Sequence, residues 1–392
     1  MKSDKLLHKK RNIHFSGICG VSMSAIAKHL NNKGFCVSGS DICLKNGLKE
    51  HNFEDIKLYD HHSVTNLKGV DAFVYTSAID ENNPELLFAR QNQIPIFRRS
   101  QVLGEILSEY KSAIAVSGSH GKTTATALLS NIFINAGLDP TVFLGGFTQD
   151  FGNYRCGKSD FVIAEACEYK KNFLDLKAKV CVVLNIDNDH LDCYCDMQEM
   201  VKGFSEFSKD SIAVINADDI NCKKIESLTS VTFSINNLSN YTAKNIAFNG
   251  KGYSFDVIAY GLKLGRIDLK IKGYHNIYNA LSSIAVSQIY NVPFSIQKDA
   301  IESFCGVKRR NEYLGKFDGI DVIADYAHHP KEILAMQKTF NDLKKRYLTV
   351  FQPHTYSRTR LLMDDFINCF NNDNPLIIYK TYTARYKYER QG

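Results

Sequence analysis

One heptapeptide, Gly-Ser-His-Gly-Lys-Thr-Thr at residues 118–124, constrains the fold more than any other feature of the sequence. It follows an apolar strand-like run and directly precedes a segment with helical periodicity. Glycines let backbone N–H groups approach phosphate oxygens, and a helix N-terminus adds partial positive charge. Lys122 is placed to reach the β- and γ-phosphates, and Thr123 to offer its hydroxyl to Mg²⁺. The segment therefore predicts a nucleotide phosphate site within a strand–loop–helix unit.

Short strands, glycine or serine turns and helical segments alternate along all 392 residues. This alternation is typical of βαβ units and parallel sheets. It starts near residue 13 and begins afresh near residues 112 and 321. A single core stops growing near ~250–300 residues. We therefore expect an α/β fold with three domains, at residues 1–110, 111–314 and 315–392.

The expected strands are short runs of β-branched or aromatic residues, at 13–15, 36–38, 72–75, 113–116, 161–164, 180–184, 321–324, 347–351 and 376–379. Residues 253–272 alternate in polarity, which predicts a small antiparallel patch. Helices are expected from Met23 to about Asn32, after Asn83 with Pro84 in the first turn, and near His275.

Composition describes an ordinary globular chain and excludes several classes of protein. Apolar residues make up 44% and charged residues 23% of the chain, too apolar a mixture for a disordered protein. The net charge of +6 is spread along the sequence, whereas nucleic-acid binders cluster their basic residues, so no nucleic-acid partner is expected. No apolar run reaches the ~20 residues of a membrane span, and no apolar signal segment follows the first five residues.

The eleven cysteines are odd in number and scattered along the sequence. Several lie in apolar strand-like runs, where a thiol behaves as a small hydrophobic group. The Cys193-Tyr194-Cys195 pair lacks the second pair that a zinc site would need. We therefore expect reduced thiols in a cytoplasmic protein that is not inserted in a membrane.

Acidic residues follow two of the strands expected near the phosphate loop. Glu165 and Glu168 come after the strand at 161–164, and the segment from Asn185 to His190 comes after the strand at 180–184. The carboxyl ends of parallel strands meet at one edge of a sheet, where ligands bind. Mg²⁺ prefers oxygen ligands and keeps several waters, so one or two protein groups are enough. The sequence predicts a magnesium site there.

A second glycine motif near the N-terminus is weaker. A dinucleotide fingerprint reads G-x-G-x-x-G, whereas residues 17–22 read Gly-Ile-Cys-Gly-Val-Ser and lack two of the three glycines. Asp41 ends the next strand, where a ribose contact would come. The motif predicts a Rossmann-like nucleotide site but does not argue for NAD.

Four later segments concentrate polar side chains near strand ends or helix starts, a placement that favours one shared site. They are residues 273–280, 308–310, 325–330 and 354–358.

Taken in order, these motifs resemble the Mur ligase family. The resemblance extends from about residue 12 to the last residues, and residues 14–18, 39–41, 76–79 and 352–359 are most similar to members that attach L-alanine to UDP-N-acetylmuramate. It implies three domains: a Rossmann-like N-terminal domain, a central P-loop ATPase domain and a truncated Rossmann-like C-terminal domain.

The resemblance also implies an ATP-dependent amide-bond ligase of peptidoglycan precursor synthesis, a process of cell-wall biogenesis, cell shape and cell division. Its substrates would be UDP-N-acetylmuramate, L-alanine and ATP, with Mg²⁺ as a cofactor. The sugar carboxylate would attack the γ-phosphate to give an acyl phosphate, and the amine of the amino acid would then displace phosphate. Because water hydrolyses acyl phosphates, we expect the third domain to close over ATP.

The roles implied by the resemblance fall on five sets of residues. The expected catalytic residues are Lys122, His190 and Arg310. ATP is expected to contact Gly118, Ser119, His120, Gly121, Lys122, Thr123, Thr124, Asn276, Asn279, Arg310 and Asp325. The UDP-sugar is expected to contact His14, Gly17, Ile18, Cys19, Gly20, Ser22, Asp41 and Ser77. The amino acid is expected to contact Tyr326, His328, His354 and Arg358. The expected metal ligands are Thr123, Glu168 and His190.

The sequence departs from the family pattern at Cys19 and Ser22, where glycine is usual, and at Thr355, where an arginine usually helps to hold the amino acid. Family members usually continue for several βα units beyond residue 392, so we expect an incomplete third domain with an exposed sheet edge. Two alternatives stay open: a ligase that attaches a ready-made peptide to the same sugar nucleotide, and a catalytically impaired protein that binds ATP or the UDP-sugar.

Overall fold

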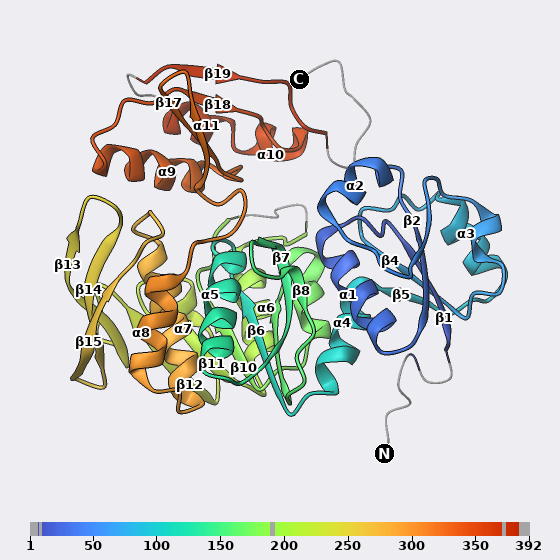
Figure 1. The fold of residues 1–392 in the computed structure, drawn as a ribbon, viewed down its shortest axis with the longest axis horizontal. Coiled ribbons are helices and arrows are strands. Elements are labelled where there is room, and N and C mark those ends of the chain that lie inside the picture. Colours follow the sequence, from blue (N-terminus) through green and yellow to red (C-terminus); the bar gives the residue numbers. More distant parts are fainter. Residues whose placement is uncertain (1–6, 8–9, 189–192, 371–373, 384–392) are drawn as a thin grey trace.

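The computed structural model describes residues 7, 10–188, 193–370 and 374–383, and Figure 1 shows three groups of elements along the chain. The N-terminal group lies beside the central group, and the C-terminal group lies across one end of the central group. This arrangement confirms the predicted three-part α/β architecture.

The N-terminal group contains a five-stranded sheet in the order β3-β2-β1-β4-β5, with every neighbouring pair parallel. The strand order reverses at β1, and open parallel sheets bind ligands at the carboxyl ends of the strands beside such a point. Ser16 is in register with Ser40 and with Tyr75, so the loops after β1, β2 and β4 meet at one edge. The elements are β1 (Asn12–Ser16), α1 (Val21–Asn32), β2 (Cys36–Ser40), α2 (Leu44–Glu50), β3 (Lys57–Tyr59), η1 (Val64–Leu67), β4 (Ala72–Tyr75), α3 (Pro84–Gln91), β5 (Ile96–Arg98) and α4 (Arg99–Ser108).

Local sequence explains the two helices that were expected here. α1 buries Met23, Ile26 and Leu30, which recur at helical spacing and face the sheet. α3 begins with Pro84, and the side chain of Asn83 caps it by accepting the amides of the second and third helical residues.

The central group is built on a ten-stranded sheet in the order β15-β14-β13-β12-β11-β10-β6-β9-β7-β8. Strands β14 and β15 form the expected antiparallel patch and extend the large sheet at one edge. The elements are β6 (Ser112–Ser117), α5 (Lys122–Asn135), β7 (Thr141–Thr148), β8 (Gly152–Arg155), β9 (Phe161–Glu165), η2 (Tyr169–Asp175), β10 (Val180–Val183), α6 (Met197–Ser208), β11 (Ile212–Asn216), η3 (Cys222–Lys224), β12 (Thr229–Ser234), β13 (Tyr241–Phe248), β14 (Tyr253–Ala259), β15 (Leu262–Asp268), α7 (Asn276–Ile289) and α8 (Phe294–Ser303).

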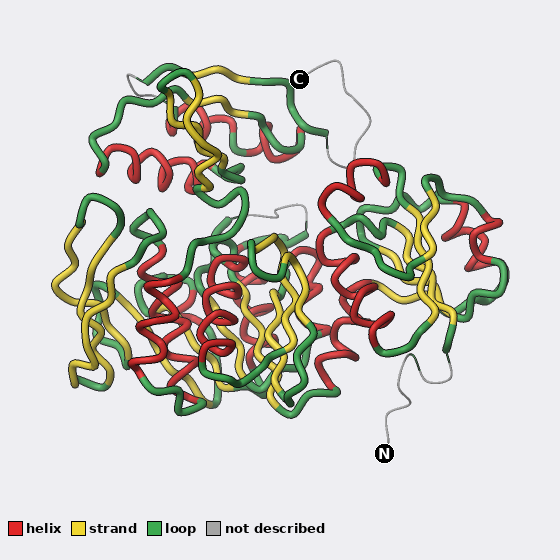
Figure 2. The backbone as a smooth tube through the Cα atoms, in the orientation of Figure 1, coloured by secondary structure: helices red, strands yellow, loops and turns green. Residues whose placement is uncertain are grey.

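Helices cover both faces of this sheet, as Figure 2 shows, and the two faces belong to different apolar cores. Ile114 and Val116 of β6 face the core that α5, α7 and α8 cover. Ala113 and Ala115 face the opposite core, which continues into the N-terminal group. Side chains alternate along a strand, so a strand buried on both faces must be apolar throughout.

The C-terminal group differs from the expected single sheet. Its strands form two separate pairs, the antiparallel hairpin β16–β17 and the parallel pair β18–β19. The hairpin turns at Asp318 and Gly319, both with positive φ (46° and 82°), the backbone of a type I′ turn. The elements are β16 (Glu312–Phe317), β17 (Ile320–Ala324), α9 (Pro330–Asp342), β18 (Thr349–Phe351), α10 (Tyr356–Leu361), α11 (Met363–Cys369) and β19 (Leu376–Ile378).

Helix α9 connects the C-terminal group to the central one. Its Asp342 accepts a hydrogen bond from the hydroxyl of Tyr253 on β14, and the ammonium of Lys338 lies 5.8 Å from the ring centre of Tyr274. The first turn of α9 faces the phosphate loop. Among the described residues, no helix combines the length and the apolar character that crossing a bilayer requires.

Candidate active site

The phosphate loop is the turn between β6 and α5. Gly118 and Gly121 have φ values of 135° and 85°, a region that favours glycine. A Cβ atom at Gly121 would lie 2.8 Å from Oδ1 of Asn279, and one at Gly118 would lie 3.1 Å from backbone atoms of Asn185. The side chain of Asn185 also accepts the amide of His120 at 2.8 Å and donates to its carbonyl at 3.0 Å. Close contact with two neighbouring segments therefore sets the shape of the loop.

Lys122, the first residue of α5, is held beneath the loop. Its Nζ donates to the carbonyl oxygens of Gly118 and Ser119, at 2.6 and 3.1 Å, and lies 3.1 Å from the carboxylate of Glu168. Burial lowers the pKa of Lys122, but the carboxylates of Glu168 and Glu165 outweigh burial and raise it overall. The side chain is a charged ammonium that bonds two carbonyl oxygens of the phosphate loop and the carboxylate of Glu168.

Two of the predicted metal ligands, Thr123 and Glu168, lie at the start of α5 and directly after β9. The hydroxyl of Thr123 donates to Glu165 at 2.8 Å, and Glu165 also accepts the amide of Gly145 at 2.9 Å. Glu168, the carboxylate predicted to hold the metal, forms an ion pair with Lys122. His190 lies outside the described residues. Thr123 at the start of α5, Glu165 at the end of β9 and Glu168 just after it therefore bring one hydroxyl and two carboxylates beside the phosphate loop, oxygen ligands of the kind Mg²⁺ prefers.

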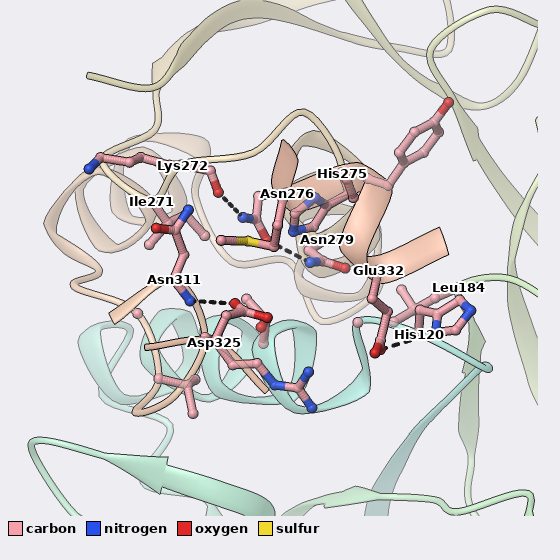
Figure 3. A pocket seen from close by; sticks show the side chains of 18 of the residues that line it. His120, Leu184, Ile271, Lys272, His275, Asn276, Asn279, Asn311, Asp325 and Glu332 are labelled. Atoms are coloured by element: carbon pink, nitrogen blue, oxygen red, sulfur yellow. Dashed lines mark hydrogen bonds and ion pairs between the residues drawn. The ribbon is translucent and has the colours of Figure 1, made fainter. Parts of the chain in front are cut away.

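A cavity of about 750 Å³ opens between the phosphate loop, α7 and the start of the C-terminal group (Figure 3). Seven of the eleven residues predicted to contact ATP line it: His120, Gly121, Thr124, Asn276, Asn279, Arg310 and Asp325. Gly118, Ser119, Lys122 and Thr123 are not among its lining residues and form the rest of the same loop and helix start. Segments more than 150 residues apart in the sequence thus share one site.

Two asparagines of α7 present fixed amide groups to this cavity. Asn276 donates from Nδ2 to the carbonyl of Lys272 at 2.6 Å, and Asn279 donates from Nδ2 to Oδ1 of Asn276 at 2.8 Å (Figure 3). Both side chains are buried. The chain of bonds fixes which amide atom of each residue donates and which accepts.

The connection between the central and C-terminal groups passes through Arg310. Its neighbours Arg309 and Asn311 have φ values of 58° and 51°, an uncommon backbone for residues other than glycine. The backbone amide of Asn311 donates to the carboxylate of Asp325 at 2.7 Å. The guanidinium of Arg310 lies 5.2 Å from the ring centre of Tyr326. Arg310 therefore lines the cavity and also contacts the predicted amino-acid site.

His120 joins the phosphate loop to helix α9. Its Nε2 lies 3.2 Å from Asp187, and its Nδ1 lies 3.1 Å from Glu332. Lys331 adds an ion pair with Asp187, at 2.5 Å. Burial lowers the pKa of His120, but the two carboxylates raise it to about 9. The phosphate loop and helix α9 are thus held together by ion pairs, in which the side chains of His120 and Lys331 contact the carboxylates of Asp187 and Glu332.

The four residues predicted to hold the amino acid form one cluster. The ring centres of Tyr326 and His328 lie 5.0 Å apart, and those of His328 and His354 lie 5.3 Å apart. Nη1 of Arg358 lies 3.3 Å from Nδ1 of His354. Thr355 has a φ of 69° and caps α10 by accepting the amide of Arg358, so it positions the helix that carries the guanidinium.

At the N-terminal sheet edge, the loop after β1 is bonded to the loop after β2. Gly17 and Ile18 donate their amides to the carbonyl of Ser40, and Asp41 accepts the amide of Cys19 at 2.9 Å. Asp41 therefore stabilises the loop after β1 through this hydrogen bond, in addition to any contact with a ribose. The amide of Gly20 donates to the carbonyl of Gly17 in the same loop.

The side chains of this edge differ in exposure. His14 and Ile18 are fully buried, so they support the edge from inside. Ser22 accepts a hydrogen bond from Arg99 at 2.7 Å, and Ser77 is partly exposed in the loop after β4.

Comparison with known proteins agrees with this geometry. The UDP-N-acetylmuramate–L-alanine ligase of Clostridium novyi is 42% identical over an alignment that covers 99% of this chain and 86% of that relative. The ligase of the same name from Clostridium acetobutylicum is 43% identical, with 96% and 84% covered. The chain belongs to the Mur ligase family. Its residues 12–111 match the model of the Mur ligase family catalytic domain, residues 116–287 that of the Mur ligase middle domain, and residues 309–385 that of the Mur ligase glutamate ligase domain.

Solved structures of other proteins have the same architecture as this Mur ligase. The UDP-N-acetylmuramate–alanine ligase of Thermotoga maritima superposes with a TM-score of 0.81 at 27% identity, covering 94% of this chain and 90% of that one. A murein peptide ligase from Psychrobacter arcticus shares the fold, with a TM-score of 0.71 at 21% identity and coverage of 95% and 91%.

Lys331 and Glu332 of this Mur ligase site were not predicted as site residues from the sequence, whereas Asp187 belongs to the acidic segment for which a magnesium site was predicted. The one local signal lay at the start of α9, where His329 and Glu332 form a capping box after which the helix begins. That signal marks a helix start. It does not indicate that Glu332 contacts a histidine 212 positions away.

Proposed function

We propose that this Mur ligase joins L-alanine to UDP-N-acetylmuramate, with conversion of ATP to ADP and phosphate. The observation that carries the proposal is the position of Arg310, which lines the nucleotide cavity and also lies over the ring of Tyr326. Arg310 thus connects the predicted phosphate site to the predicted amino-acid site, the cluster of Tyr326, His328, His354 and Arg358. The names of the relatives that are about 42% identical support L-alanine as the amino acid.

In the first step, the sugar carboxylate attacks the γ-phosphate. Lys122 and Arg310 bring positive charge to the phosphoryl oxygens, where charge gathers during transfer. The fixed amides of Asn276 and Asn279 offer a donor and an acceptor of the kind that pairs with the edge of adenine. The oxygens of Thr123, Glu165 and Glu168, with His190, would hold Mg²⁺, which neutralises phosphate charge when bound.

In the second step, the amine of the amino acid displaces phosphate from the acyl phosphate. The guanidinium of Arg358 would bind the amino-acid carboxylate, because the two groups match in charge and in planar geometry. Tyr326, His328 and His354 would enclose the short side chain. We place the reaction in the cytoplasm, where ATP and the UDP-linked sugar are supplied.

A phosphate-release assay tests the function. Release is expected only when ATP, UDP-N-acetylmuramate and L-alanine are all present. Release that needs a peptide in place of L-alanine would support the peptide-ligase alternative, and UDP-sugar binding without any release would support the impaired binding protein.

Replacing Arg358 by alanine is expected to raise the KM for L-alanine by about 10- to 100-fold, since a hydrogen bond to a charged group contributes about 1.5–3 kcal/mol. The KM for ATP should change little. Arg360→Ala, an exposed arginine of the same helix, is the matched control. An unchanged KM for L-alanine in Arg358→Ala would contradict the assignment.

Replacing Asn279 by alanine is expected to raise the KM for ATP about tenfold, the effect of losing roughly 1–1.5 kcal/mol of hydrogen bonding. The measurement is steady-state turnover at saturating UDP-sugar and L-alanine. Asn82→Ala, an exposed asparagine of the N-terminal group, is the control and should match the wild type. A larger effect on L-alanine than on ATP would contradict the prediction.

A further inference from the structure

Three side chains from separate segments converge where the phosphate loop meets helix α9. His120 belongs to the phosphate loop, Asp187 to the loop after β10, and His329 to the N-cap of α9. One ligand atom of each residue lies within 4.8 Å of the others. Asp187 and His329 are buried, and the side chain of His120 is 19% exposed.

We propose that His120, Asp187 and His329 form a site for a transition-metal dication of the Zn²⁺ type, and that a bound ion holds the phosphate loop against α9 and inhibits turnover. Two imidazoles and one carboxylate are the ligand types that zinc selects, whereas the oxygens around Thr123 suit Mg²⁺. The two sites therefore differ in metal preference.

The spacing of His120 and Asp187 fits a tetrahedral ion, and His329 lies within the 4.8 Å that encloses all three ligand atoms. Ligand atoms at about 2.0–2.1 Å from zinc lie roughly 3.3 Å from one another at the tetrahedral angle. Nε2 of His120 and Oδ2 of Asp187 are 3.2 Å apart. A cation could enter between these two atoms with little movement of either side chain.

The surrounding contacts also resemble those of a metal centre. Metal-bound histidines usually give their other ring nitrogen to a carboxylate, which orients the ring. Nδ1 of His120 lies 3.1 Å from Glu332 in this way, and the second oxygen of Asp187 is held by Lys331. His120 and Asp187 both line the 750 Å³ cavity, which offers an entry path and room for a water as the fourth ligand.

Metal binding at this position has a mechanical consequence. Its ligands come from the central group on one side and from α9 on the other, so a bound ion opposes their separation. His120 immediately precedes Gly121 and Lys122, so the ion would also fix the loop that must receive phosphate. The inhibition of turnover by zinc rests on the proposed ligase function, whereas the binding of zinc does not.

The test uses the full chain in excess Mg²⁺, titrated with ZnCl2 by calorimetry and, separately, with Co²⁺ followed by its visible absorption. The wild type is expected to bind one zinc ion, to gain thermal stability and to lose turnover over the same concentration range. Cobalt in this site should show a tetrahedral spectrum without thiolate charge transfer.

His329→Asn is the decisive variant, because asparagine keeps the helix N-cap while removing the imidazole. It is expected to weaken zinc affinity and zinc inhibition, each measured relative to the zinc-free variant, at least tenfold. Asp187→Asn should weaken binding in the same way, and His61→Gln, a change at an exposed histidine, should not.

Equal zinc affinity in the wild type and both ligand variants would overturn the site. Binding without inhibition would overturn the locking role alone. If zinc binds as described but the chain releases no phosphate with L-alanine and the UDP-sugar, the ligase assignment fails and the metal site stands.

Discussion

Lys122→Ala is expected to lower turnover at least 10³-fold while UDP-N-acetylmuramate still binds, because the loss removes about 4 kcal/mol of charge stabilisation in the transition state. The ammonium lies at the base of the phosphate loop, within 3.1 Å of the carbonyl of Ser119 and of Glu168. The predicted UDP-sugar loop lies in a different sheet, on the N-terminal group. Phosphate release measures the first effect and calorimetry with the UDP-sugar measures the second.

Two controls make this result specific. Lys111→Ala removes an exposed lysine that pairs with Asp160 and should keep turnover within twofold. Thermal unfolding of Lys122→Ala must be followed as well, since the change takes a cation from the buried Glu168. Turnover retained by a folded Lys122→Ala protein would refute the role of the phosphate loop.

The sequence predicted those parts of the structure that local patterns determine. The phosphate loop needs two glycines with positive φ between a buried strand and a helix, and both the spacing and the residue types are visible in seven consecutive positions. Strands such as β6 are apolar throughout because both faces are covered. These features depend on neighbours in sequence and are therefore readable from it.

Other features depend on how distant segments pack. The C-terminal strands were expected in one sheet, but the Asp318-Gly319 pair turns β17 back onto β16. A two-residue Asp-Gly turn of this kind favours a hairpin, so β17 pairs with its neighbour in sequence and not with β18. The contact between Lys331 and Asp187 joins residues 144 positions apart, and no local pattern specifies it.

The predicted UDP-sugar contacts also divide into features that local sequence determines and features that tertiary packing determines. The glycine loop and Asp41 lie at the expected sheet edge, because strand register brings the ends of β1 and β2 together. The burial of Ile18 follows from tertiary packing, since its side chain fills the space beside Gly39, where a Cβ atom would lie 2.4 Å from the Ile18 side chain. A motif indicates which loop approaches a ligand but not which of its side chains faces outward.

Glu85→Ala is expected to destabilise the protein by about 3–5 kcal/mol, the usual effect of breaking a buried charged network. Glu85 is fully buried on α3 and accepts hydrogen bonds from the hydroxyls of Ser16 and Ser40, at 2.8 and 2.7 Å. Asn66 donates to it at 2.8 Å, and His62 lies 3.1 Å away. One carboxylate therefore joins the ends of β1 and β2 to the segment after β3.

The position of this network links stability to substrate binding. Ser16 immediately precedes Gly17, and Ser40 immediately precedes Asp41, the two ends of the predicted UDP-sugar edge. Glu85→Gln keeps the size of the side chain but turns an amide N–H toward groups that donate. We expect the glutamine variant to fold, to lose roughly 1–3 kcal/mol of stability and to bind the UDP-sugar more weakly, with the KM for ATP unchanged.

The pH dependence of stability tests whether the charge of Glu85 causes the loss of stability in Glu85→Gln. Burial raises the pKa of Glu85, but hydrogen bonds from His14 and His62 outweigh burial and hold it well below its usual range. A lowered folded-state pKa stabilises the fold above the unfolded pKa of ~4.3, and this stabilisation is lost as the pH falls below that value. The stability difference between wild type and Glu85→Gln should thus be constant near neutral pH and shrink below about pH 4. Urea unfolding at several pH values measures it, and Glu81→Gln, at an exposed carboxylate paired with Arg90, is the matched control. A difference that stays constant through pH 3 would show that Glu85 acts by its shape and not by its charge.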